Sequence, residues 1–309
     1  MTWPASLAPL LFIAPVLVIA LAVQARPRGL AASVERLARR VNLALDDDVR
    51  GEVMTFQRRR VLASGAGAIA GLAVALALAP ADSPARGAAL VLCIFGGGAV
   101  GVAAAALGHA RRATGAAREA TAGRAVTGRL LPVAIDDLVP AGERIGMRIA
   151  LAVGGALSLG AIGAVAALEG LEAIDPRVLA GAAVFLGIGV VSAAAWEAVA
   201  RRIASSRPIA GGAQALAWSD ALRSQTLRDM VVLPLTAALY APLTLLTEIV
   251  LAAPAPLDSA LGAALGLLAL AAFIAAIVVA VLQSSPGSPR NPAQHYQRRL
   301  WPELAGGGR

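Results

Sequence analysis

The chain has 309 residues, of which 58% are hydrophobic and 15% are charged, and its mean hydropathy is +0.72. Soluble proteins carry about 25% charged residues, so this composition excludes an ordinary soluble fold and predicts an integral membrane protein. All 27 basic residues are arginine, and the formal net charge is +8. A positive charge of this size also occurs in nucleic-acid-binding proteins. The positions of the arginines favour a membrane explanation instead, and we expect no nucleic-acid partner.

The first apolar segment, residues 7–23, contains Pro9 and Pro15 and has no charged side chain before it. Five arginines follow it within residues 26–40, and the positive-inside rule then places the amino terminus outside the cell. The segment could instead be a signal peptide cleaved near Ala20-Leu21-Ala22. The basic region that begins a signal peptide is absent, however, so we expect a retained leading helix.

Six further apolar segments form three pairs. They cover residues 61–79 and 87–107, 149–168 and 178–199, and 231–253 and 260–282. A helix rises about 1.5 Å per residue, so each segment is about long enough to cross a bilayer. The sequence therefore predicts an all-α fold, a polytopic bundle of seven transmembrane helices.

The polar regions set the predicted orientation. Three connectors and the C-terminal tail contain every arginine except Arg86 and Arg177. These regions cover residues 24–60, 108–148, 200–230 and 283–309. Because arginine and lysine concentrate on the cytoplasmic side of a membrane, we predict a bacterial plasma-membrane protein with its carboxyl terminus in the cytoplasm.

An acidic residue precedes each pair of apolar segments at a similar distance. These residues are Asp48, Asp137 and Asp220. This regularity favours three parallel copies of a connector plus a hairpin; chance similarity among Ala-, Gly- and Arg-rich sequences is the alternative. The division is a leading helix at 1–23, units at 24–107, 108–199 and 200–282, and a tail at 283–309. We expect the tail to be mobile, although Tyr296 and Trp301 could anchor part of it at the membrane interface.

Glycines four residues apart mark the second and third apolar segments. Gly67 and Gly71 lie in the second segment, and Gly97 and Gly101 lie in the third. This spacing lets two helix backbones approach closely. We expect these glycines to serve packing within the bundle; self-association of two copies through the same faces is the alternative.

The sixth segment, residues 231–253, carries polar residues that could line a transport path. These candidates are Glu248, Tyr240, Thr244 and Thr247. Ionisable groups at membrane depth are costly and often functional, although Glu248 could simply reach the outer surface. Two prolines interrupt the same segment, which predicts an irregular helix there. In the fifth segment, Glu197 is expected to pair with Arg201 one helical turn later.

The sequence shows no catalytic or metal-binding pattern. His109 and His295 are the only histidines, Cys93 is the only cysteine, and lysine is absent. These residues do not make a zinc or haem ligand set or a phosphate-binding lysine motif. We expect no enzyme activity, no metal and no cofactor.

The first connector has a helical pattern of its own. Leu30, Val34, Leu37 and Val41 recur at helical spacing, with arginines on other faces. The pattern predicts an amphipathic helix that lies on the anionic lipids of the inner leaflet or docks a cytoplasmic ATPase or regulator. The three connector aspartates are expected to pair with arginines of neighbouring units and to hold the cytoplasmic ends together.

This arrangement of segments, with its Ala-, Gly- and Arg-rich composition, resembles uncharacterised multi-pass membrane proteins of actinobacteria. The resemblance covers layout and composition and includes no diagnostic motif. Some such proteins are associated with transporter operons, which implies a non-enzymatic subunit or accessory of a transport system. The alternative is a structural or regulatory scaffold that recruits a cytoplasmic partner through its basic connectors. A homo-oligomer is compatible with either reading.

Overall fold

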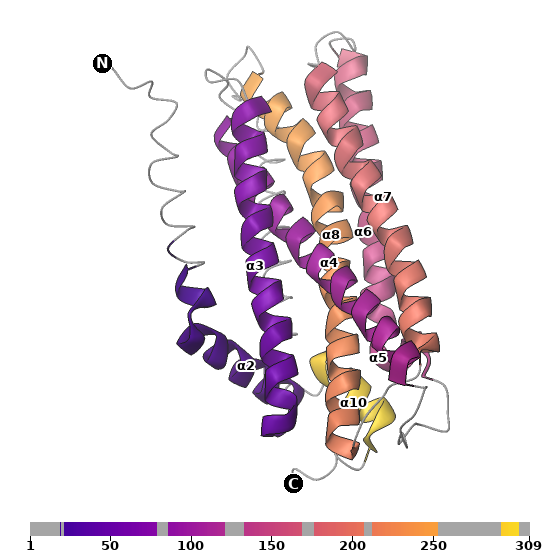
Figure 1. The fold of residues 1–309 in the computed structure, drawn as a ribbon. Coiled ribbons are helices and arrows are strands. Elements are labelled where there is room, and N and C mark those ends of the chain that lie inside the picture. The colour runs from indigo at the N-terminus through magenta and orange to yellow at the C-terminus, as the bar shows by residue number, and fades with distance from the viewer. Residues whose placement is uncertain are drawn as a thin grey trace, which may run out of the picture.

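The protein is described by a computed structural model that covers Ile19 and residues 22–78, 86–120, 133–168, 176–206, 212–252 and 292–302. These ranges contain helices and no strand, so the predicted all-α class is confirmed for them. The helices are α2 (Pro27–Val41), α3 (Asp47–Leu78), α4 (Arg86–Ala120), α5 (Ile135–Leu138), α6 (Ala141–Leu168), α7 (Pro176–Ser205), α8 (Ala213–Ala252) and α10 (His295–Leu300) (Figure 1). A short 3-10 turn, η3 (Pro292–Gln294), precedes α10.

Four helices in the described ranges are long and apolar enough to cross a membrane. These stretches are Val49–Leu76, Cys93–Arg112, Ala141–Gly163 and Pro176–Ser205. Large apolar side chains on them face outward, such as Val191 of α7, which is 69% exposed. Exposed apolar surface of this extent supports a membrane location, because water would penalise it.

Four of the seven predicted spans therefore coincide with apolar helices of the structure. The predicted spans at 7–23 and 260–282 lie outside the described residues, apart from isolated positions at the end of the first. The predicted span at 231–253 falls in α8, which is not among the four apolar stretches of the described residues.

α3 and α4 pack closely along their glycines. A Cβ atom placed on Gly67 would lie 2.1 Å from the carbonyl oxygen of Gly97, and one on Gly101 would lie 1.9 Å from that of Ala63. Both distances are shorter than any van der Waals contact, so only glycine permits this approach. The predicted packing of these two segments within the bundle is confirmed.

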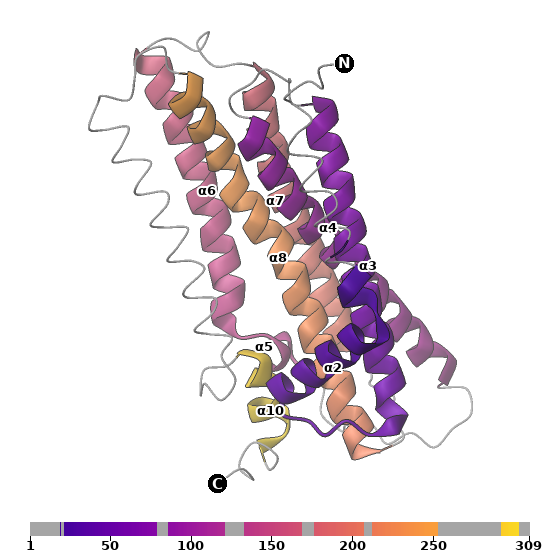
Figure 2. The ribbon, with the colours of Figure 1, turned by 90° about the vertical axis from the view of Figure 1, so that its left-hand side faces the viewer.

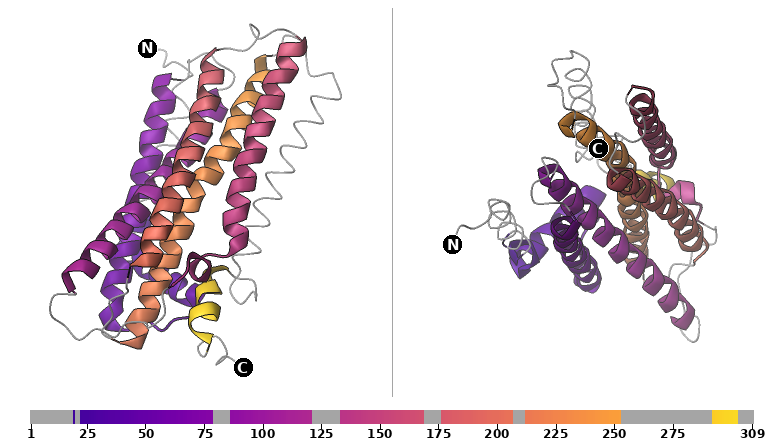
Figure 3. Two further views of the ribbon diagram at one scale, coloured as in Figure 1. Left: turned by 90° about the vertical axis from the view of Figure 1, so that its right-hand side faces the viewer. Right: turned by 90° about the horizontal axis from the view of Figure 1, so that it is seen from above.

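α8 is the central helix of the bundle. It packs against α4, α6 and α7, while α6 and α7 contact α8 more extensively than each other (Figures 2 and 3). Pro242 lacks the N–H that would normally bond to the carbonyl of Ala238. A Cβ atom on Gly154 of α6 would lie 2.2 Å from this carbonyl oxygen, so a glycine allows α6 to pack where the proline interrupts α8.

The regions predicted to be cytoplasmic gather at one end of the bundle, which we call the connector end. It holds α2, α5, α10, the first turns of α3 and α8, and the last turns of α7 (Figure 1). The helices extend well beyond the predicted spans at this end, since α3 begins at Asp47 and α8 at Ala213. The gathering agrees with the predicted topology, and the side of the membrane that this end faces stays a prediction.

Candidate functional site

Polar and charged side chains of α8 are buried at the connector end. Each of the following is at most 7% exposed: Asp220, Arg223, Ser224, Gln225, Thr226 and Asp229. We expected these residues to form a cytoplasmic connector, and they instead lie in the centre of a folded end. Burying polar groups costs free energy unless they are hydrogen-bonded or paired, so their partners show what the end is built to hold together.

Two ion pairs tie α8 to the neighbouring connectors. Nε of Arg60 in α3 lies 2.7 Å from Oδ2 of Asp229, and Nε of Arg228 lies 3.0 Å from Oε1 of Glu143 in α6. The amide of Gln225 donates to the other oxygen of Asp229 at 2.6 Å. Burial raises the pKa of the Asp229 carboxyl, and the Arg60 guanidinium opposes that shift.

Hydrogen bonds to backbone carbonyls add to these pairs. The indole nitrogen of the fully buried Trp196 in α7 donates to the carbonyl of Leu227 at 2.8 Å. The hydroxyl of Ser224 donates to the carbonyl of Leu138, at the end of α5, at 2.7 Å. Each bond removes freedom between two elements, so α5 and α7 are fixed against α8.

The predicted amphipathic helix forms as α2, but its apolar face is covered by protein. Leu30, Val34, Leu37 and Val41 are all buried, and most of them belong to an apolar cluster that includes Trp218 of α8. The indole nitrogen of Trp218 donates to the carbonyl of Ala44, just after α2, at 2.7 Å. This face of α2 therefore does not lie on lipid. The opposite face carries the exposed Arg36 and Arg39.

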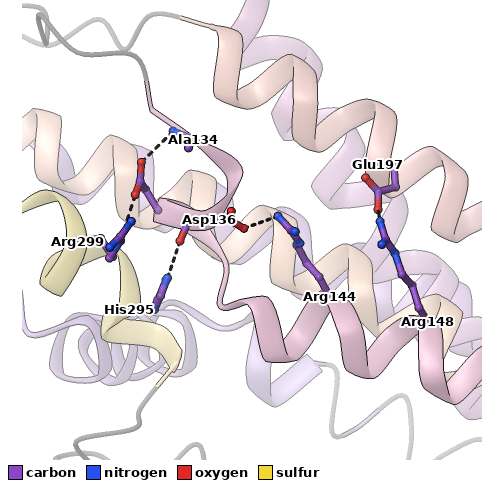
Figure 4. A network of polar contacts seen from close by, with 8 residues as sticks. Ala134, Asp136, Arg144, Arg148, Glu197, His295 and Arg299 are labelled. Carbon is purple, nitrogen blue, oxygen red and sulfur yellow. Dashed lines mark hydrogen bonds and ion pairs between the residues drawn. The ribbon is translucent and has the colours of Figure 1, made fainter.

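The C-terminal segment is folded at the connector end, in contrast to the mobile tail that we expected. Tyr296 is fully buried in the same cluster as Trp218. Nε2 of His295 lies 2.7 Å from the carbonyl oxygen of Asp136 in α5 (Figure 4). The amide of Gln297 donates to the carbonyl of Asn42 at 3.3 Å. Residues 292–302 therefore join α2, α5 and α8.

Two of the three connector aspartates contact this C-terminal segment. Oδ1 of Asp137 lies 3.2 Å from Nε of Arg299, and Oδ2 of Asp137 accepts a hydrogen bond from the backbone N–H of Ala134. Asp220 accepts a hydrogen bond from the indole of Trp301 at 3.1 Å. We expected arginines of neighbouring units as partners. Asp48 is in α3, and its side chain lies outside the described residues.

Charged residues also connect α6 with α5 and α7. Arg144 of α6 pairs with Asp136 at 2.5 Å, and Arg148 pairs with Glu197 of α7 (Figure 4). The predicted pair of Glu197 with Arg201 is wrong, because Arg201 donates instead to the backbone carbonyl of Glu197 at 3.3 Å. The local spacing allowed either partner for Glu197, and the position of α6 decides between them.

The residues predicted to line a transport path have ordinary packing contacts where the structure describes them. The ring of Tyr240 packs edge to face against Phe185 of α7, with 5.8 Å between ring centroids. The hydroxyl of Thr244 donates to the backbone carbonyl of Tyr240. Thr247 and Glu248 belong to α8, but their side chains lie outside the described residues.

No known protein-family model matches this chain, and comparisons with curated proteins and with solved structures find no match either.

Proposed function

We propose that the protein is a non-enzymatic scaffold of the bacterial plasma membrane whose connector end recruits a cytoplasmic protein. The observation that carries this proposal is the network of ion pairs and hydrogen bonds that joins different elements at the connector end. Segments from both sides of the bundle and from the C-terminus converge on the buried polar part of α8. A transport subunit needs a path between helices, whereas a scaffold needs a surface held in a fixed shape, and the bonds described above favour the second.

The exposed face of α2 is the surface that we assign to the partner. Arg36 and Arg39 lie on this face, and the buried apolar face fixes the orientation of the helix. The C-terminal segment also holds the end of α2, since Gln294 donates to the carbonyl of Arg40 at 3.3 Å. Guanidinium groups bind carboxylates well, so the partner should offer an acidic surface.

The proposal includes the membrane arrangement expected from the sequence. Seven spans, three parallel connector-plus-hairpin units and an outside amino terminus would place the connector end in the cytoplasm, where a soluble partner can reach it. A scaffold of this kind can act as a monomer or as a homo-oligomer.

A subunit or accessory of a transport system is the second candidate. Pro234 and Pro242 lie inside α8, and this helix packs against α4, α6 and α7 in the bundle. Prolines in a central membrane helix weaken its backbone hydrogen bonds, which helps a helix to change shape. This observation favours a moving α8 over a purely static bundle.

Photocrosslinking from defined positions tests the scaffold. A photoreactive amino acid is placed at Arg36 or Arg39 in the full chain in its own membrane, with the lipid-facing position Val191 as control. We expect one cytoplasmic protein to be captured from both α2 positions and not from position 191. Capture of lipid alone from the α2 positions would contradict the proposal.

Complementation of a deletion strain separates the two candidates. The variant Arg36→Glu/Arg39→Glu reverses the charge of the assigned surface, whereas Pro242→Ala restores a backbone donor in α8. The scaffold predicts that the first variant fails to complement and that the second succeeds. The opposite pattern, with both variants present in the membrane at normal amounts, would favour transport.

A further inference from the structure

A cavity of about 340 Å³ lies between α3, α4 and α8 at the connector end. Charged side chains and one histidine line the cavity, and they come from all three helices. These residues are Glu52, Arg59, Arg60, His109, Arg112 and Asp229. The stretches of α3 and α4 that line the cavity are the ends of two candidate spans, so the cavity sits where the bundle meets the membrane surface.

Two arginines of the cavity have no carboxylate partner within the part of the chain that the structure describes. Arg60 is paired with Asp229, but Arg59 of α3 and Arg112 of α4 form no ion pair in those residues. The ring of His109 also lines the cavity and packs edge to face on Phe56, with 5.0 Å between ring centroids. The cavity therefore brings together, from different helices, two cations that have no ion-pair partner among the described residues, an arrangement that favours an anion.

Apolar residues of α3 continue the side of the helix on which the cavity residue Arg59 lies. Arg59, Leu62, Ala66 and Ile69 follow one another at spacings of three and four residues, so they share one side of the helix. Leu62 is 50% exposed and Ile69 is 45% exposed. A molecule with its anionic group in the cavity would thus have apolar protein surface beside it, one turn further into the predicted span.

We propose that this cavity binds the phosphate of an anionic glycerophospholipid, with Arg59 and Arg112 on the phosphate oxygens and an acyl chain along Leu62 and Ile69. Arginine suits this role because its planar guanidinium can donate two parallel hydrogen bonds to a phosphate. A free phosphate compound would use the same cations, but it would leave the adjoining apolar face without a function. The lipid site does not depend on the proposed cytoplasmic partner.

Native mass spectrometry of the full chain in mild detergent tests the site. The protein is titrated with phosphatidylglycerol, with phosphatidylcholine as the zwitterionic probe and glycerol phosphate as the soluble one. We expect phosphatidylglycerol to bind most tightly. The variant Arg59→Gln/Arg112→Gln should weaken its binding about 25-fold, from about fivefold per arginine near a membrane surface.

Two further variants make the result specific. Glu52→Gln removes a carboxylate from the cavity and should tighten phosphatidylglycerol binding, because it removes repulsion of the phosphate. Arg201→Gln/Arg202→Gln removes two exposed arginines of α7 and should leave binding unchanged.

Three results would overturn the proposal. The first is unchanged phosphatidylglycerol affinity in a folded Arg59→Gln/Arg112→Gln variant. The second is unchanged affinity in Glu52→Gln, a change at an exposed position that decides the question if the double variant does not fold. The third is glycerol phosphate binding as tightly as the lipid, which would make the cavity a site for soluble phosphate compounds.

Discussion

Arg60 and Asp229 form an ion pair between α3 and α8 in which the two partners differ in burial. The Asp229 side chain is 4% exposed, whereas that of Arg60 is 35% exposed. A carboxylate that is this buried keeps its desolvation cost when its cation is removed, whereas the more exposed arginine can be hydrated when the carboxylate is removed. The pair should therefore respond differently to the loss of each member.

Arg60→Gln should lower the free energy of unfolding by about 2 kcal/mol, because it leaves the Asp229 carboxylate buried without a cation. Asp229→Asn should cost less than about 1 kcal/mol, since the amide can still accept the bond from Gln225. The double variant should regain most of the loss. Thermal unfolding of the purified protein in detergent measures all three, and a larger loss for Asp229→Asn than for Arg60→Gln would contradict the assignment.

The loss of stability caused by Arg60→Gln should be smaller at acidic pH. Burial raises the pKa of Asp229, with Arg60 opposing, so removal of Arg60 raises it further. A carboxyl with a raised pKa in the folded state stabilises the fold most below its ordinary pKa, and this contribution is lost as pH rises through the raised value. Melting temperatures at about pH 4 and about pH 7.5 should show a smaller difference from wild type at the lower pH. The double variant, which lacks the carboxyl, should show no such change.

Substitution of two glycines by alanine should have opposite effects on stability. Gly97→Ala places a Cβ atom 2.1 Å from the carbonyl oxygen of Gly67, so it should destabilise the α3–α4 pair by about 1–3 kcal/mol. Gly187→Ala of α7 meets no atom within 4 Å, so the better helix propensity of alanine should leave stability equal or slightly higher. Thermal unfolding of both variants provides the comparison, and equal losses would argue against close packing at Gly97.

Tyr296 should be required to hold the C-terminal segment. Tyr296→Ala removes a fully buried ring and should weaken the attachment of the C-terminal segment by about 3 kcal/mol. Residues 292–302 should then detach from the connector end. Tyr296→Phe keeps the ring and should change little. Limited proteolysis in detergent should cleave the tail of the alanine variant faster, while the phenylalanine variant stays as resistant as wild type. Equal resistance of both variants would show that the ring does not anchor the segment.

The predicted orientation can be tested with single cysteines, because Cys93 is the only native one. In a Cys93→Ala chain, Arg36→Cys and Arg298→Cys mark the connector end, and Arg177→Cys marks the opposite end. A membrane-impermeant maleimide should label position 177 in intact cells and positions 36 and 298 only in inside-out vesicles. The reverse pattern would invert the topology.

The helices of the bundle could be predicted from the sequence because their signals lie between near neighbours in the chain. Runs of apolar residues predicted the four helices that the structure bears out as candidate spans. The spacing of Gly67, Gly71, Gly97 and Gly101 predicted close packing within the bundle, and the structure shows that it joins α3 to α4. The pattern Leu30–Val34–Leu37–Val41 likewise predicted α2 and its apolar face.

What covers each face was decided by the tertiary structure. The apolar face of α2 packs in one cluster with residues of α3, α8 and the C-terminal segment, although hydropathy alone allowed lipid equally well. Arg60 and Asp229, or Asp220 and Trp301, lie far apart in the chain, and no periodicity joins them. Sequence patterns report which side of a helix is apolar or charged, because side-chain direction follows the helix period. Which partner satisfies that side depends on how distant segments pack, and the buried polar part of α8 exists only because they converge there.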